Sequence, residues 1–251
     1  MRRLIGVTAL AAVLALSIAA VASAAMPGGG MMGGGISGGG TSASVPMMGT
    51  GSGAGPGATT GGPTHFTDVP AGSWFATYAD QMVAHGYMTG YVGGGFGPND
   101  PVTRGQFAVI MARMMGLGPS AATTFSDLNG YPGAGVVEAM AVKGIVHGRA
   151  DGTFGPYDMV TRAQMAAMMA RALDATGHPA SPAEMQQAMT QAMQQMHDLA
   201  GNWAAGPMAL MVHMGVMQGD GHGMLLPGAT TTRAQAAAMM WRWHEAAQPH
   251  Q

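Results

Sequence analysis

A threefold internal repeat constrains the fold of this chain more than any other feature of its sequence. The motif Thr-Arg-(Gly or Ala)-Gln begins at Thr103, Thr161 and Thr232. Proline lies five residues before each Thr, and glycine lies nine, thirteen and seventeen residues before it. The glycines thirteen residues before the Thr are Gly90, Gly148 and Gly219. We therefore expect one supersecondary motif in three copies.

Each copy is predicted to form two helices joined by a glycine-rich loop. Threonine is a favourable N-cap and glutamine three residues later completes a capping box, so the second helix begins at the aligned Thr. Those glutamines are Gln106, Gln164 and Gln235. The first helix is expected from about Trp74 to His85, and from Trp203 to Met214 in the third copy, with glycine just past each end. The predicted fold class is all-α, because apolar residues recur at helical spacing.

An insertion separates the second and third copies. The third copy begins thirteen residues later than the spacing of the first two predicts. In this interval Ser181 and Glu184 form a capping box around Pro182. Four methionines then follow at helical spacing: Met185, Met189, Met193 and Met196. We predict an inserted amphipathic helix over residues 179–196 whose methionine face packs on the bundle.

The residues before the repeats divide into two parts. Two arginines, an apolar run and a small-x-small site predict a signal peptide over residues 1–25, with a retained membrane anchor as the alternative. No second apolar run of spanning length follows, so no stable membrane insertion is expected after cleavage. Residues 26–63 are rich in Gly, Ser, Thr, Pro, Ala and Met and predict a disordered tether. The three copies then occupy residues 64–120, 121–178 and 197–251.

The arginine of each motif lies where local physics disfavours it. A cation in the first turn of a helix opposes the helix dipole at a cost of about 0.3–1 kcal/mol. A negative partner should therefore face Arg104, Arg162 and Arg233. The partner is either an aspartate of the repeat or an anionic ligand that also uses the free N–H groups of the helix start. The aspartates are Asp68, Asp127 and Asp198. A further arginine ten residues after each Thr is expected to lie in solvent or to snorkel: Arg113, Arg171 and Arg242.

Taken together, residues 64–245 resemble three bacterial S-layer homology (SLH) repeats. The residues that carry the resemblance in the first copy are Phe66-Thr-Asp68-Val-Pro70, Trp74, Gly90-Tyr, Phe96-Gly-Pro98 and Val102-Thr103-Arg104. The second copy matches from Phe125-Ser-Asp127 to Val160-Thr161-Arg162, and the third copy is more degenerate. The resemblance implies a pseudo-threefold bundle with grooves between neighbouring repeats.

The resemblance also implies a function. Such grooves bind anionic secondary cell-wall polysaccharides, often bearing a pyruvate ketal, and the motif arginine holds the acidic sugar. Carried over to this chain, the ligand-binding residues are Arg104, Arg162, Arg233, Trp74, Trp203, Gly90, Gly148 and Gly219. Core packing is the alternative for the tryptophans, and a structural role is favoured for the aspartates. The implied protein is a secreted, non-catalytic component of the cell wall or S-layer that can self-associate in a surface layer.

Three departures from the family pattern bear on the grooves. Glutamine replaces the family's glutamate in all three motifs, which keeps the helix cap and removes its charge. The middle copy has Pro132 where the others have tryptophan, and the third copy has Leu225 where the family has phenylalanine. We therefore expect one or two working grooves rather than three equal ones.

Composition removes other classes of function. A net charge of −2 gives no case for nucleic acid, and the absence of cysteine removes thiolate metal sites and cysteine nucleophiles. No catalytic constellation emerges, so no enzyme activity, cofactor or metal site is predicted. The alternative function is copper handling outside the cytoplasm, because the chain has 27 Met and 9 His. His197, His213 and His222 lie near its methionine-rich helices.

Overall fold

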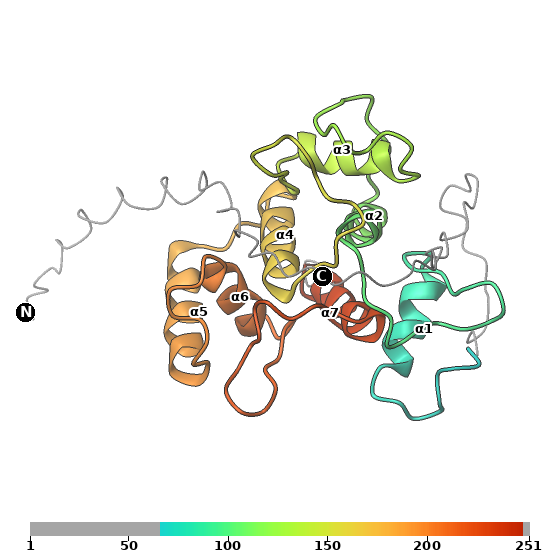
Figure 1. The fold of residues 1–251 in the computed structure, drawn as a ribbon. Helices are drawn as coiled ribbons and strands as arrows, with labels where there is room; N and C mark the ends of the chain where they lie inside the picture. The colour runs from blue at the N-terminus through green and yellow to red at the C-terminus, as the bar shows by residue number, and fades with distance from the viewer. Residues whose placement is uncertain (1–65, 248–251) are drawn as a thin grey trace, which may run out of the picture. The chain divides into compact units, whose positions relative to one another are not determined.

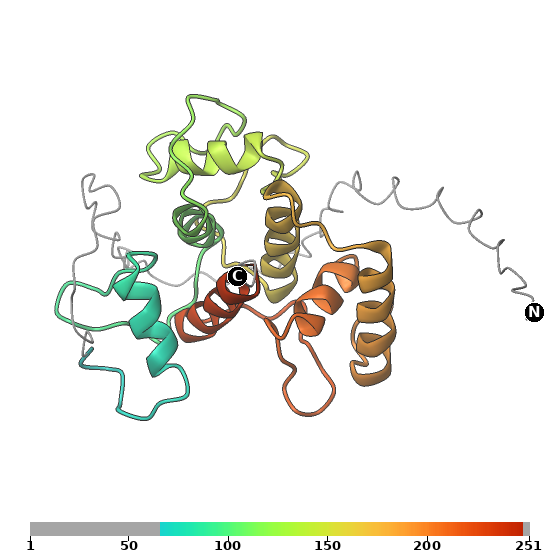
Figure 2. The ribbon, with the colours of Figure 1, turned by 180° about the vertical axis from the view of Figure 1, so that it is seen from behind.

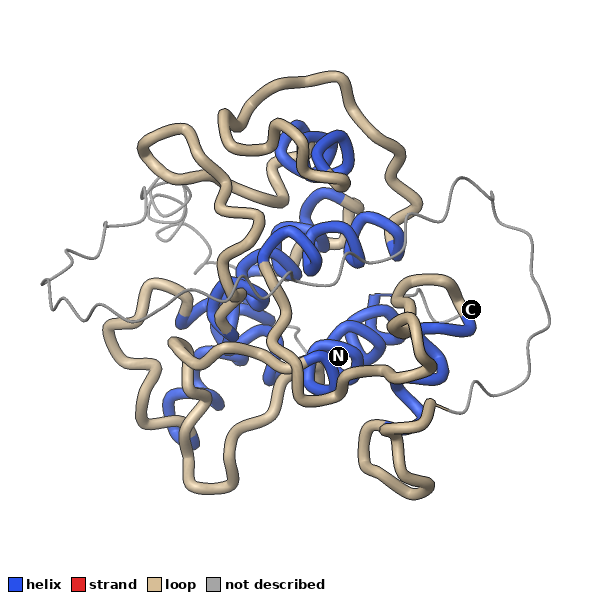
Figure 3. Tube along the Cα trace, turned by 45° about the vertical axis from the view of Figure 1, so that its right-hand side comes forward, coloured by secondary structure: helices blue, strands red, loops and turns tan. Residues whose placement is uncertain are grey.

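The computed structural model describes residues 66–247, which belong to one compact unit of the chain. The predicted signal peptide and tether lie outside the described residues. The described helices are α1 (Ala76–Ala84), α2 (Arg104–Met114), α3 (Ala134–Val142), α4 (Arg162–Ala175), α5 (Pro182–Gln195), α6 (Ala205–His213) and α7 (Arg233–Ala247). Between them residues 66–247 contain loops and three isolated β-bridges, which confirms the all-α class (Figures 1 and 3). None of these helices combines the length and the apolar character that crossing a membrane requires.

The second helix of each copy begins at the predicted motif. Thr103 Oγ1 accepts a hydrogen bond from the Gln106 backbone N–H, and Gln106 Oε1 accepts one from the Thr103 N–H. The same reciprocal pair links Thr161 to Gln164 and Thr232 to Gln235. Each cap contributes about 1 kcal/mol, so α2, α4 and α7 all begin at the motif arginine.

The first helix of each copy is fixed at its end rather than at its start. No side-chain cap holds the beginning of α1, α3 or α6. Gly86, Gly144 and Gly215 follow these helices with a φ of +71°, a conformation that glycine adopts without strain. Because the first turn is uncapped, α1 and α6 begin two residues later than predicted, and Trp74 and Trp203 lie in the preceding turn.

The three copies interlock through their helices. Each first helix packs on the second helix of the preceding copy: α3 on α2, α6 on α4, and α1 on α7 (Figures 1 and 2). Backbone hydrogen bonds also connect the copies, from Val102 N to Thr231 O, from Thr231 N to Val160 O, and from Val160 N to Val102 O. These contacts run from the first copy to the second, to the third and back to the first, so they close a ring.

Methionine fills much of the core. The fully buried side chains include three phenylalanines, Phe96, Phe107 and Phe154, and a larger group of methionines. That group includes Met82, Met88, Met111, Met140, Met165, Met169, Met208, Met211 and Met240. An unbranched thioether adapts to irregular gaps, so methionine serves here as a core residue on the inward faces of the helices.

The inserted helix is present as α5 and packs on α6. Its fully buried residues are Ala188 and Ala192, while Met185, Met189 and Met196 are partly buried against the core. The predicted four-methionine face is wrong at Met193, which is 41% exposed. At 3.6 residues per turn, each step of four residues advances about 40° around the helix, so the third methionine of the series turns away from α6.

Candidate functional site

The motif arginines bind backbone carbonyls of the next copy. Arg104 donates from Nε to Phe154 O and from an Nη to His147 O, both at 3.1 Å. Arg162 donates in the same way to Leu225 O and Gln218 O at 2.6 Å. Arg233 donates to Phe96 O and Thr89 O at 2.7 Å. Each guanidinium fork therefore clamps the glycine-rich loop of the following copy at two points.

The motif aspartates hold the same loops by their N–H groups. The Asp68 carboxylate accepts hydrogen bonds from Phe96 N and Gly97 N at 2.6 and 2.7 Å. Burial alone would raise the pKa of Asp68, but these two donors, with Arg233 nearby, lower it below its usual value. Asp127 and Asp198 make equivalent bonds to Phe154 and Gly155, and to Leu225 and Leu226. Each loop is thus fixed by an aspartate of its own copy and an arginine of the preceding one.

The first of the two expected partners, an aspartate of the repeat, is not paired with any motif arginine. Within residues 66–247 the one salt bridge joins Arg149 to Asp158, so no motif arginine is ion-paired with a motif aspartate. The N–H groups at the helix starts are also occupied. Arg104 N and Gly105 N donate to Asp158 O and Pro156 O, and the starts of α4 and α7 do the same with the following copy. Within the chain itself, backbone carbonyl dipoles face the motif arginines.

The three arginines differ in how far they are covered. Arg233 is 1% exposed and lies between the rings of Tyr91 and Phe96, with centroids at 4.9 and 4.8 Å. Arg104 is 5% exposed and lies over Phe154 at 4.7 Å. Burial, together with the charges of Arg149 and Arg171, lowers the pKa of Arg104 to about 10, so it stays charged at neutral pH.

Arg162 keeps an open side because the third copy lacks the corresponding rings. Leu225 stands where the other loops have phenylalanine, and Asp220 stands where the first copy has Tyr91. Among the described residues no aromatic ring lies over Arg162, and its side chain is only partly buried. The change that looked like degeneration of the third copy is therefore what exposes this guanidinium.

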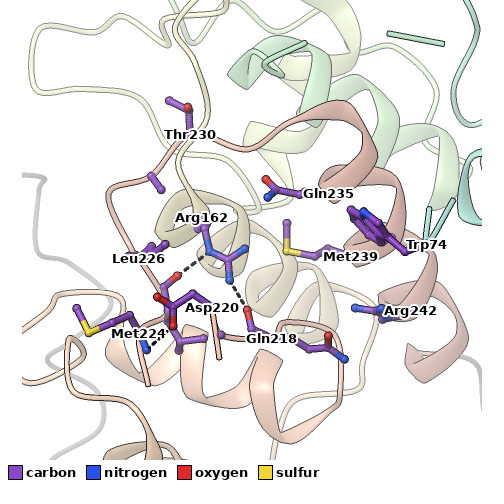
Figure 4. Close-up of a pocket in the computed structure, with 14 residues that line it drawn as sticks. Trp74, Arg162, Gln218, Asp220, Met224, Leu226, Thr230, Gln235, Met239 and Arg242 are labelled. Carbon is purple, nitrogen blue, oxygen red and sulfur yellow. Dashed lines mark hydrogen bonds between the residues drawn. The ribbon is translucent and has the colours of Figure 1, made fainter. Parts of the chain in front are cut away.

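A groove of about 350 Å³ lies beside Arg162, and we call it the α7 groove. Trp74 comes from the first copy, Arg162 from the second, and the loop from Gln218 to Thr230 from the third. Helix α7 forms the remaining wall with Gln235, Ala238, Met239 and Arg242. Figure 4 shows Trp74 and Arg242 on one side of the groove and Arg162 with Asp220 on the other. All three copies contribute to this site.

Arg242 is a lining residue that the sequence argument did not select. Its Nε and an Nη donate to Tyr78 Oη at 3.2 and 3.1 Å, and its guanidinium lies 4.9 Å from the Tyr78 ring centroid. The corresponding Arg113 and Arg171 instead donate to carbonyls of their own copies, those of Tyr87 and Ile145. Because the partner of Arg242 comes from the first copy, the repeat pattern alone could not reveal its place in the groove.

The remaining predicted site residues are dispersed. Trp74 and Trp203 are 61% and 51% exposed, and Trp203 does not line the α7 groove. Gly219 lines it, whereas a side chain at Gly90 or Gly148 would meet the rings of Phe66 or Phe125 and the backbone of its own loop. The structure therefore brings together Trp74, Arg162, Gly219 and Gln235.

The histidines named for copper handling have other contacts. His213 Nδ1 is hydrogen-bonded to Gln191 Oε1 at 3.0 Å, and the His197 ring lies against Gly223. In the part of the chain from Phe66 to Ala247, no three His, Asp or Glu side chains are grouped so that they could hold one metal ion. The methionine pairs of the tether lie outside the described residues.

Known proteins share this pattern. The family model described as S-layer homology domain matches residues 65–108, 124–166 and 195–237. An endoglucanase of Bacillus sp. (strain KSM-635) is 29% identical over 182 residues, which cover 70% of this chain and 19% of that protein. A cellulosome-anchoring protein of Acetivibrio thermocellus is 29% identical over 162 residues, covering 62% of this chain and 35% of that protein. The S-layer protein EA1 of Bacillus anthracis is 26% identical over 174 residues, covering 68% and 19%. The chain thus spans 35% or less of the length of these relatives.

Proposed function

Because the chain belongs to the S-layer homology domain family, we propose that it anchors to the cell wall by binding an anionic secondary cell-wall polysaccharide in the α7 groove. The protein is a secreted, wall-associated protein of the cell surface. The name of the cellulosome-anchoring relative supports anchoring as the role. The proposed module is not catalytic, and the endoglucanase relative, of which it matches 19%, carries most of its length outside the shared region.

The exposed indole of Trp74 is the observation that carries this proposal. A tryptophan that is 61% exposed contributes little to the core, yet its apolar face borders a groove that also contains two guanidinium groups. A sugar ring offers an apolar C–H face for stacking and polar hydroxyls at its edge, so an indole beside hydrogen-bonding groups suits it. The combination favours a carbohydrate over a purely apolar ligand.

The charges of the groove favour an acidic sugar. Arg162 and Arg242 supply two positive charges and Asp220 supplies one negative charge. Arg162 donates two hydrogen bonds to the loop, and the remaining N–H donors of its guanidinium can bind a ligand. A ketal carboxylate would bind there in the bidentate geometry that guanidinium favours. We propose that Arg104 and Arg233 do not bind the ligand but hold the three copies together in their closed ring.

Sedimentation with cell-wall sacculi tests the proposal. The full chain is incubated with sacculi of the producing bacterium before and after acid extraction of the secondary polymer. We expect binding before extraction and none after it. Trp74→Ala should weaken binding about tenfold without changing the unfolding midpoint, because the ring is exposed.

Trp203→Ala is the matched control, since it removes an indole at the aligned position with similar exposure and away from the α7 groove. It should bind within about twofold of the parent chain. Binding that survives extraction would overturn the proposed ligand. Equal losses in the two tryptophan variants would overturn the α7 groove as the site.

A further inference from the structure

The second copy places a tyrosine where the other copies place a short polar side chain. Tyr131 aligns with Ser73 and Asn202, thirty residues before each motif Thr. The backbone of the turn is the same in all three copies. Ser73 N, Tyr131 N and Asn202 N each donate to the carbonyl three residues earlier, at 3.1, 3.0 and 3.0 Å. The difference between the copies at this position is therefore confined to the side chain.

Tyr131 lies directly on the first turn of α2. A Cβ atom built on Gly105 would lie 2.7 Å from Tyr131 Cζ, closer than real Cβ contacts allow. Gly133 is similarly tight, with Val109 Cγ2 at 2.6 Å and Tyr131 Cε1 at 2.7 Å from such an atom. The ring thus packs between its own turn and the face of α2 that begins at Gly105.

The glycine and the tyrosine form a matched pair. The residue after the motif arginine is Ala163 in α4 and Ala234 in α7, but Gly105 in α2. In α2, where that methyl group is missing, the aligned turn brings in a tyrosine ring that needs its space. Gly105 and Tyr131 are 26 residues apart in sequence and in contact in space, so we treat them as one structural feature.

Tyr131 occupies the face that corresponds to the wall of the α7 groove. Gly105 and Val109 of α2 align with Ala234 and Ala238 of α7, and Ala238 lines the α7 groove. Trp74 of the first copy approaches α7 of the third copy, and Tyr131 of the second copy approaches α2 of the first copy in the same way. Trp74 stands in solvent, whereas burial, with a smaller effect of Tyr157, raises the pKa of Tyr131 to about 12. The Tyr157 ring packs edge-on at 5.5 Å.

The opposite wall of this second groove is covered as well. The motif arginine that belongs to it is Arg233, which is 1% exposed between Tyr91 and Phe96. Its Nη1 is buried without a hydrogen-bond partner. The groove beside α2 therefore presents neither an exposed guanidinium nor an exposed indole.

We propose that Tyr131, seated on Gly105, closes the groove beside α2, so that the chain offers fewer ligand sites than it has repeats. The inference rests on the proposed function, because it concerns how many grooves that function uses. Removing the ring while keeping the turn should open a site that the protein now fills with its own side chain.

Calorimetric titration of the full chain tests the proposal, with a hexose methyl glycoside that carries a 4,6-pyruvate ketal as the probe. The parent chain should bind at most two molecules. Tyr131→Ser installs the residue of the first copy, and Pro132→Trp in addition restores the missing indole. Tyr91→Asp, the residue of the third copy, uncovers Arg233 as Asp220 does beside Arg162. We expect the number of bound molecules to rise by one in the variant that carries all three changes. Tyr157→Ala, which trims the neighbouring exposed ring and leaves Tyr131 in place, should leave the number unchanged.

Thermal unfolding supplies a readout that needs no ligand. Gly105→Ala alone should lower the midpoint because the new methyl group meets both the Tyr131 ring and the Pro156 carbonyl oxygen, and Tyr131→Ser should remove the part of that loss that comes from the ring. A parent chain that binds three molecules, a folded triple variant with unchanged stoichiometry, or a Gly105→Ala loss that Tyr131→Ser does not relieve at all would each overturn the closure. A parent chain that binds none would instead overturn the proposed function.

Discussion

The surface beside α2 that aligns with the α7 groove has the same backbone frame as that groove and different side chains. In both, a capped helix starts at the motif and an arginine of the preceding copy clamps the loop. In both, a turn of the following copy lies over the helix. Beside α7 the arginine and the indole remain accessible, while beside α2 aromatic rings cover both positions. The residues shared by all copies make the hydrogen bonds that hold the three copies together. The residues that differ between copies decide whether a groove is open.

The largest effect is expected at the covered arginine. Arg233→Met removes a guanidinium that is 1% exposed and leaves the carbonyl of the buried Phe96 without its donor, so we expect a loss of about 3 kcal/mol in the free energy of unfolding. Arg162→Met should cost about 1 kcal/mol, since the Arg162 side chain is only partly buried and water can reach the exposed Gln218 in its place. Urea denaturation of both variants measures the difference. Equal losses would show that the two grooves are equally buried.

A ring added to the open groove should make it resemble the closed one. Leu225→Phe restores the residue of the other two loops and places an aromatic face near Arg162. Because Leu225 is fully buried, we expect a cost of about 1–3 kcal/mol and a clear loss of sacculus binding. Met193→Phe, at an exposed position on α5 outside the groove, is the control for an added ring. Unchanged binding in folded Leu225→Phe would show that the open side of Arg162 does not matter.

Alkaline pH should lower the stability of the folded chain through Tyr131. The pKa of Tyr131 is raised to about 12 when folded, mainly by burial, against about 10 when unfolded. The neutral phenol therefore contributes stability that is fully present below about pH 10 and is lost as pH rises toward 12. Thermal midpoints at pH 8 and pH 11 should differ less in Tyr131→Ser than in the parent chain. An identical pH dependence would place Tyr131 in solvent.

Acid should also lower the stability of the folded chain, by a smaller amount, because it protonates Asp68, which holds the loop of the first copy. The pKa of Asp68 is lowered in the folded chain, because the hydrogen bonds from Phe96 and Gly97 outweigh the opposing effect of burial. That contribution is present above about pH 4 and is lost as pH falls through the folded value. Asp68→Asn should flatten the decline in unfolding free energy below pH 4. Asp174→Asn, at an exposed carboxylate near the end of α4, should leave the decline as it is.

Local chemistry made the frame predictable. The helix starts follow from Thr and Gln three residues apart, and the ends of the first helices follow from glycine at a left-handed position. The partners of the arginines were not predictable in this way. Arg233 binds carbonyls 137 and 144 residues away, and a carbonyl has no sequence signature, since every residue carries one.

The expectation of unequal grooves rested on Pro132 and Leu225, and the number of working grooves stays a prediction. Pro132 belongs to the turn beside α2. Leu225 suggested a damaged groove, yet the open groove contains it. Tyr131 and Gly105 are unremarkable one at a time and gain meaning only when the fold places them in contact. A comparison of the copies at every position, rather than at the shared ones, would have marked both. The prediction that Met193 packs on the bundle was wrong for a simpler reason: residues spaced four apart drift around the surface of an α-helix.

The closed ring of helix contacts also sets the order in which the chain can mature. Copy one needs α7 from the far end of the sequence to cover α1, so the last partner of the first copy is made last. A polypeptide that leaves the cell amino terminus first holds its early segments without their final neighbours until the end emerges. Contacts of such long sequence separation form slowly. The first copy therefore reaches its final packing only after α7 has been synthesised.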